Sequence, residues 1–148
     1  MRRKIFSIFL GLFAGFIAFA ISHLINSSYH PLPKDVDVHK PEELRQAMSK
    51  LPTSYFVGTV FCHGLAVCVA SFISSLFKGH AWLTAVFVPA ALFLLLALGG
   101  HKLVPHPDWF RWADLAVFLP AGFLGYLIAL LLIGTKKQNP EIPQALAN

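Results

Sequence analysis

Charged residues are scarce in this sequence, and the places where they are missing indicate its architecture. Only 13% of the 148 residues are Asp, Glu, Lys or Arg, whereas 56% are hydrophobic. Four long stretches contain none of these charged residues, namely 5–25, 55–77, 81–98 and 115–134. A composition and distribution of this kind exclude an ordinary water-soluble domain.

Each charge-free stretch is close to the length of a membrane-spanning helix, since roughly 20 helical residues cross about 30 Å of hydrocarbon. None shows the sustained alternation of a barrel strand, and in lipid every backbone polar group must be paired within the protein. The sequence therefore predicts a single all-α membrane domain, 1–148, built as a bundle of four transmembrane helices. The first stretch also fits a secretory signal peptide, but its apolar run continues to Ile25, so we interpret it as a spanning helix.

Basic residues are distributed unevenly between the two expected ends of the bundle. The segments 1–4, 78–80 and 135–148 contain six basic residues and one acidic residue, whereas 26–54 and 99–114 contain six of each. Because short cytoplasmic segments are enriched in Lys and Arg, we expect both termini to be cytoplasmic, in the inner membrane of a bacterium. The net charge of +5 then lies at helix ends beside anionic lipid, and nucleic acid is not an expected partner.

The first outer loop, 26–54, contains the pattern of a short helix. Pro41 is followed by two glutamates, as is common at a helix start, and three apolar residues follow at helical spacing, Leu44, Met48 and Leu51. This pattern predicts an amphipathic helix over about 41–51 that lies on the membrane surface or caps the bundle.

The second outer loop, 99–114, includes the sequence "HKLVPHPDWFRWAD". Its Trp and Phe residues are of the kind enriched at the lipid headgroup level, and Asp108 is placed to cap the start of the last helix. We therefore interpret this stretch as an aromatic anchor that leads into the fourth span.

Small residues recur at every fourth position in three of the expected spans, and such stripes let helix backbones approach closely in lipid. They predict a tightly packed bundle, or an oligomer joined through one of the stripes. The stripe residues are Gly11 and Gly15, then Gly58, Cys62, Ala66, Ala70 and Ser74, and finally Ala121, Gly125 and Ala129.

Histidines supply the candidate binding chemistry. His63 lies inside the second span and His23 near the end of the first, and two histidines on different helices can hold a haem iron. Their expected depths differ by about 9 Å at a rise of 1.5 Å per residue, which disfavours haem. The simpler interpretation is that His63 is neutral and hydrogen-bonded to a carbonyl or hydroxyl group, such as one from Ser or Thr on a neighbouring helix.

A metal site on the outer face is a second possibility. Imidazole and carboxylate groups are suitable ligands for transition metals. The candidate ligands are His30, His101, His106, Asp35 and Asp108. No two of these histidines have the four-residue spacing of a preformed helical zinc site.

Several short segments resemble a group of small bacterial four-span integral membrane proteins of unknown function. The resemblance rests on Ser22-His23, "YHPLPKDVD", "ELRQAMSKLP", "PHPDWF", and Pro120 with Gly125. It implies a four-helix architecture and a bacterial origin, and it supplies no catalytic residue.

Motifs of common enzymes are missing from the sequence, including Gly-x-Ser-x-Gly, His-Glu-x-x-His and a phosphate-binding loop. We therefore expect a non-enzymatic membrane protein without a cofactor. With the lipid bilayer as its environment, it would act as an accessory or interaction subunit that packs with itself or with a larger membrane complex. The alternatives are a metal- or haem-binding protein that uses His63 or the loop histidines, and a small transporter or membrane-surface enzyme.

Overall fold

Four long helices form the body of the protein. The computed structural model describes residues 2–33, 36–37, 39–76, 82–103 and 106–137. These residues form five helices and no strand: α1 (Arg2–Tyr29), α2 (Pro41–Ser49), α3 (Thr53–Leu76), α4 (Trp82–Leu103) and α5 (Asp108–Lys137). All except α2 are long and apolar enough to cross a membrane. The predicted all-helical fold with four candidate spans is confirmed, and it indicates a membrane protein.

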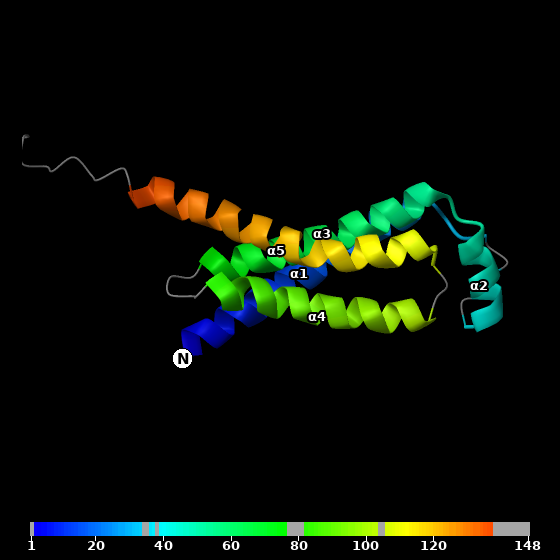
Figure 1. Ribbon diagram of the computed structural model, residues 1–148, viewed down its shortest axis with the longest axis horizontal. Coiled ribbons are helices and arrows are strands. Elements are labelled where there is room, and N and C mark those ends of the chain that lie inside the picture. Colours follow the sequence, from blue (N-terminus) through cyan, green and yellow to red (C-terminus); the bar gives the residue numbers. More distant parts are fainter. Residues whose placement is uncertain (1, 34–35, 38, 77–81, 104–105, 138–148) are drawn as a thin grey trace, which may run out of the picture.

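The four long helices run side by side, and α2 lies across one end of them (Figure 1). The start of α1 and the end of α5 lie at the opposite end. Helix α3 is central, since it packs against α1, α5 and α4 and is the most buried of the four candidate spans. The segment 78–80, expected on the cytoplasmic side, and the tail from 138 to 148 lie outside the described residues.

Helix boundaries differ from those expected from the charge-free stretches. Helix α4 continues to Leu103 instead of ending at 98, and α5 begins at Asp108 instead of 115, so most of the expected aromatic loop is helical. The absence of charge marks only the hydrocarbon section of a helix, whereas a helix can extend into the polar headgroup region. An acidic residue such as Asp108 is also favourable in the first turn of a helix. Because α5 begins at Asp108, Asp114 lies inside this helix and not in a loop.

The short helix α2 ends at Ser49, two residues before the expected limit of 51. Its Ala47 and Met48 side chains are buried. Met48 packs with Phe56 of α3 and Phe110 of α5, so α2 covers one end of the bundle. A position on the membrane surface stays a prediction.

The small-residue stripes bring helices of the same chain together. A Cβ atom on Gly15 would lie 2.8 Å from the carbonyl oxygen of Ala66, and one on Gly125 would overlap the carbonyl oxygen of Cys68. The backbones of α1 and α5 are therefore in close contact with the backbone of α3. Other stripe residues are buried at these interfaces or elsewhere in the bundle: Cys62, Ala66, Ala70, Ser74 and Ala129, with Ala121 packed against the core. Gly11 faces Ser74, and Gly58 faces Asn26.

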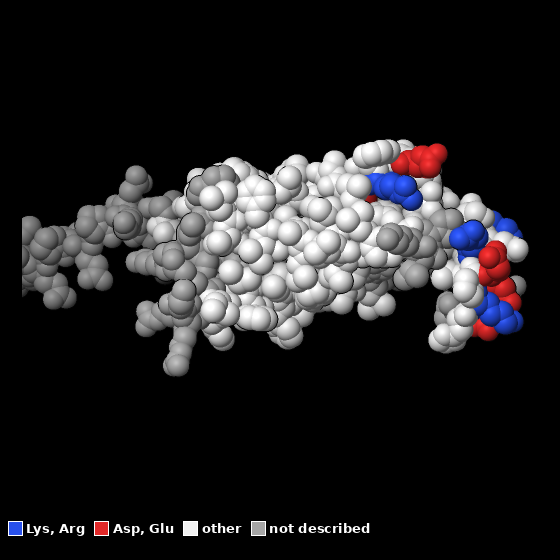
Figure 2. All heavy atoms as spheres, turned by 60° about the horizontal axis from the view of Figure 1, so that its bottom comes forward, with Lys and Arg blue, Asp and Glu red and all other residues white. Residues whose placement is uncertain are grey.

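The outer surface of the bundle is apolar along its length. Large exposed hydrophobic side chains occur on all four long helices, for example Phe9, Phe61, Leu95 and Leu131. In the face shown in Figure 2, described Lys, Arg, Asp and Glu residues gather toward the end that carries α2. Such a surface is suited to contact with lipid chains along the sides and with water at the end.

Candidate functional site

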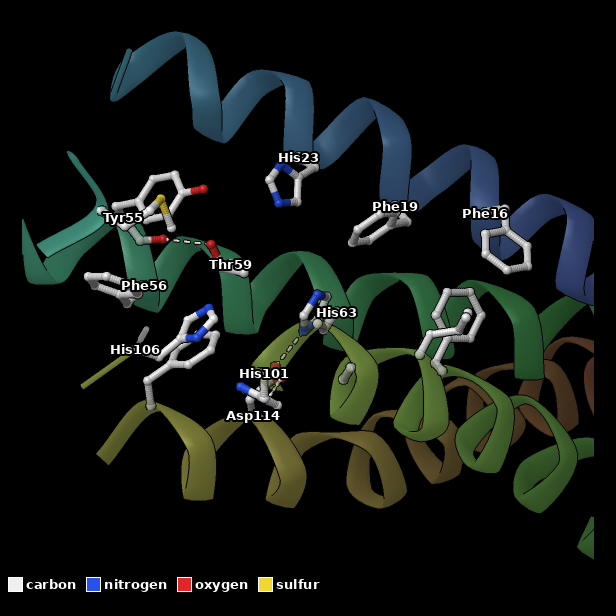
Figure 3. A pocket seen from close by; sticks show the side chains of 16 residues that line it. Phe16, Phe19, His23, Tyr55, Phe56, Thr59, His63, His101, His106 and Asp114 are labelled. Carbon is white, nitrogen blue, oxygen red and sulfur yellow. Dashed lines mark hydrogen bonds and ion pairs between the residues drawn. The ribbon is translucent and has the colours of Figure 1, made fainter. Parts of the chain in front are cut away.

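A cavity of about 290 Å³ lies among α1, α3, α4 and α5, beneath α2 (Figure 3). Its walls are mostly apolar, but they also contain four histidines and a carboxylate. These polar residues are His23 of α1, His63 of α3, His101 of α4, His106 in the segment before α5, and Asp114 of α5. Met48 of α2 contributes to the wall at the covered end.

Asp114 joins two of these histidines, and the three side chains are called here the His–Asp–His cluster (His63, Asp114 and His101). The carboxylate is fully buried, with 0% of Asp114 exposed. Its Oδ1 lies 2.5 Å from Nδ1 of His63, and its Oδ2 lies 2.9 Å from Nε2 of His101. When Asp114 is a carboxylate, each ring donates one N–H to a separate oxygen. The cluster therefore links α3, α4 and α5 through charge-assisted hydrogen bonds.

The local sequence of α5 explains why Asp114 points inward. Phe110, Asp114 and Phe118 are spaced four residues apart, so they share one face of the helix, and all three are buried. Placing two large aromatic side chains in the core therefore brings the carboxylate between them into the core as well.

Stacking holds the His63 ring in place. Its centroid lies 5.5 Å from that of Phe19 and 5.8 Å from that of Phe118, with interplanar angles of 26° and 23°. His101 makes an edge contact with Phe110, with ring centroids 5.4 Å apart and an interplanar angle of 63°. Each ring is thus oriented by an aromatic neighbour as well as by Asp114.

Only one nitrogen of each histidine in the cluster bonds to Asp114, so the second nitrogen can bind another group. His63 uses Nδ1 toward Asp114 and His101 uses Nε2, so the second nitrogens are Nε2 and Nδ1, respectively. A neutral imidazole that donates one N–H to a carboxylate carries an unprotonated second nitrogen, which accepts a proton or a hydrogen bond. His63 lines the cavity with 16% of its side chain exposed, so its second nitrogen is the better placed of the two.

Asp114 places a negative charge inside the cluster. With both rings neutral it carries one negative charge, and in the described part of the chain the only ion-pair partners of Asp114 are these histidines. A buried net charge is costly in a medium of low dielectric constant. The two ring N–H groups directed at Asp114 partly compensate this charge.

A second polar group lies between α1 and α3. The amide of Asn26 donates to the carbonyl oxygen of Tyr55 at 3.1 Å and to the hydroxyl of Thr59 at 3.2 Å. His23 lies on the same side of the cavity, with its Nδ1 3.3 Å from the Ser27 hydroxyl. These bonds fix the part of α1 that forms one wall.

The sequence-predicted site residues are only partly brought together. His23 and His63 line the same cavity, and the ring of Phe19 is a neighbour of both. Of the proposed metal ligands, His101 and His106 are adjacent, with ring centroids 5.1 Å apart. His30 is hydrogen-bonded near Ser54 instead, with 3.3 Å between Nε2 and the hydroxyl, and does not line the cavity.

The remaining proposed ligands lie elsewhere. Asp108 is exposed at the start of α5, and Asp35 lies outside the described residues. Among the residues that the structure describes, no three His, Cys, Asp or Glu side chains are grouped so that they could hold a metal ion.

The sequence did not predict that Asp114 pairs with two histidines at the cavity. Asp114 was assigned to an outer loop because a charged residue ended the apolar stretch. The available signal was its spacing of four residues from both Phe110 and Phe118, which places it on the buried face of a helix that begins earlier.

Comparisons with known protein families, with curated proteins and with solved structures return no match. The resemblance to small four-span bacterial proteins therefore stays an expectation. Any function has to be argued from the cavity and its His–Asp–His cluster.

Proposed function

We propose that this protein binds a small lipid-soluble ligand in the cavity and contacts it through the His–Asp–His cluster. The observation that carries the proposal is a fully buried carboxylate that orients two histidines at the cavity wall. Ionisable side chains at membrane depth are costly, and they commonly mark a ligand site or a proton pathway.

A purely structural role is the main competing explanation, because polar side chains also join helices in membranes. Two features favour the functional role. The close approach of α1 and α5 to α3 is already provided by glycines at the helix contacts. In addition, His63 is not sealed in the core but faces the cavity with its second nitrogen available.

The earlier expectation of an accessory or interaction subunit rested on the small-residue stripes. These stripes pack helices of one chain against each other, so they give less support to that role. A homo-oligomer or a larger complex would have to form through the exposed apolar side chains that otherwise face lipid. The cavity is therefore the stronger basis for a proposal.

We further propose that the protein lies in the inner membrane of a bacterium with both termini in the cytoplasm. The density of Lys and Arg in the segments 1–4, 78–80 and 135–148 supports this orientation. In that orientation the cavity lies in the outer half of the membrane, below α2. Its ligand would then be exchanged with the outer leaflet.

Native mass spectrometry after mild detergent extraction tests the proposed binding. The wild-type protein is compared with Asp114→Asn and with Asp108→Asn, a control with the same chemical change at an exposed position of the same helix. We expect the wild type and Asp108→Asn to carry a small molecule that Asp114→Asn has lost. Retention of this molecule by Asp114→Asn, or its absence from the wild type, would overturn the proposal.

A further inference from the structure

We infer that the ligand is an isoprenoid quinone or quinol, whose head group occupies the cavity while its tail extends into lipid. This inference rests on the proposed function and names its ligand class. It depends on four properties of the cavity: where it opens, which surfaces line it, which charge it tolerates and how large it is.

The cavity opens sideways between α1 and α4. Helix α1 packs mainly on α3, and α4 packs mainly on α5 and α3, so α1 and α4 make few contacts with each other. They meet at the rings of Phe16 and Phe93, whose centroids are 5.0 Å apart and which form the floor of the cavity. Farther toward α2, Leu96 lines the cavity while 50% of it is exposed at the surface.

Gly100 completes this opening, because it lines the cavity and a Cβ atom placed on it would meet nothing within 4 Å. Leu96 and Gly100 both lie in the candidate span Leu83–His101. The opening therefore faces lipid, and a ligand enters from the membrane.

The walls are suited to a flat conjugated ring. Phe16 and Phe19 line the cavity from α1, Phe56 from α3, Phe93 from α4 and Phe110 from α5. The ring of His106 also stacks on Phe110 at 4.7 Å with an interplanar angle of 10°. Aromatic side chains arranged in this way favour stacking and edge contacts with another aromatic or quinonoid ring.

The charges favour a neutral ligand with oxygen atoms. An anionic head group would be repelled by Asp114, and a cationic one would compete with the histidines for carboxylate oxygens that are both already bonded. A carbonyl oxygen can accept a hydrogen bond from a histidine, and a hydroxyl can donate one to an unprotonated ring nitrogen. A quinone carries two carbonyl oxygens at opposite edges of one ring, and a quinol carries two hydroxyls at the same positions.

Polar side chains lie on more than one wall of the cavity. His23 belongs to α1, His63 to α3, and His106 precedes α5, and all three line the cavity. A quinone that contacts His63 with one oxygen can therefore direct its second oxygen toward another histidine.

The size of the cavity limits the ligand to a small head group. Its volume of about 290 Å³ lies at the lower end of the range of ligand pockets, roughly 300–1,000 Å³. One ring or two fused rings fit this volume better than a macrocycle such as haem. An isoprenoid tail does not need to fit, because the opening between α1 and α4 lets it remain in lipid.

Quinone titration tests this inference. The protein is placed in lipid nanodiscs free of quinone and titrated with a short-tail benzoquinone and a short-tail naphthoquinone, while quenching of its intrinsic fluorescence is recorded. Gly100→Phe is designed to fill the opening. Gly99→Phe is the matched control, because Gly99 is adjacent to Gly100 and equally open but does not line the cavity.

We expect saturable binding of at least one quinone by the wild type and by Gly99→Phe. Binding should be at least about tenfold weaker for Gly100→Phe and for His63→Gln, the change expected when access or a hydrogen bond in a buried site is lost. Thermal melting of each variant checks that it remains folded. No saturable binding by the wild type, or equal effects of the two glycine substitutions, would overturn the inference.

The native mass measurement separates this inference from the proposed function. A co-extracted molecule that depends on Asp114 but has no quinone mass would leave the proposed function intact and refute the quinone assignment. Absence of any such molecule, together with no saturable quinone binding, would refute both.

Discussion

Removing Asp114 should affect stability in a way that depends on what replaces it. In Asp114→Ala, the N–H groups of His63 and His101 lose their acceptors at a position that is fully buried. Each buried donor left without a partner costs about 1–3 kcal/mol, so the two together should lower the free energy of unfolding by about 2–6 kcal/mol.

Asp114→Asn should be much milder. The amide oxygen can accept the N–H of His63, and the amide nitrogen can donate to Nε2 of His101 once that ring adopts its other tautomer. We therefore expect the free energy of unfolding to fall by about 1 kcal/mol or less. The variant nevertheless lacks the negative charge that orients the His63 ring toward the ligand, so it should keep its fold and lose the bound molecule.

The assay is reversible unfolding in mixed micelles of a mild detergent and sodium dodecyl sulfate, followed by circular dichroism. Asp108→Asn is the control and should lie within about 0.5 kcal/mol of the wild type, as exposed substitutions usually do. An Asp114→Ala protein as stable as the wild type would show that the carboxylate does not hold the two rings. Equal losses for Asp114→Ala and Asp114→Asn would refute the hydrogen-bonding argument.

Two further predictions concern packing around the cavity. Gly15→Val should lower the free energy of unfolding by about 1–3 kcal/mol or more, because its Cβ would lie 2.8 Å from a carbonyl oxygen of α3; Gly99→Val, in open space, should change it little in the same assay. Met48→Ala should loosen α2, since truncating a buried Met costs about 2–5 kcal/mol. Limited proteolysis should then cut near α2 faster than in the wild type, whereas Gln46→Ala, on the exposed side of that helix, should leave the rate unchanged; equal rates for both variants would contradict the packing of α2.

Much of the fold could be predicted because a lipid environment leaves few choices for an apolar chain. The four charge-free stretches correspond to α1, α3, α4 and α5, since helices satisfy their own backbone hydrogen bonds. The structure places Gly15 and Gly125 against backbone atoms of α3, the kind of close approach that small-residue stripes permit. They did not indicate which helices meet, because any stripe can face any other.

The site was predictable only in part. His63 was expected to bond a neighbouring helix, but its partner was sought among hydroxyl and carbonyl groups. Asp114 was placed in a loop because a charged residue ends an apolar stretch in sequence, whereas in the structure two histidines satisfy that charge. These partners are 51 and 13 residues away, and no local pattern reveals contacts over such separations.

The most direct test of the central claim is the reactivity of His63 toward diethyl pyrocarbonate, mapped by mass spectrometry with the cavity loaded and after the ligand has been removed. If the second nitrogen of His63 faces the ligand, His63 should be modified in the stripped protein and protected in the loaded one. The exposed His39 should react in both. A His63 that is inert in both preparations would identify the cluster as a sealed structural clamp, and equal modification in both would place the ligand elsewhere; either result would contradict the proposed function.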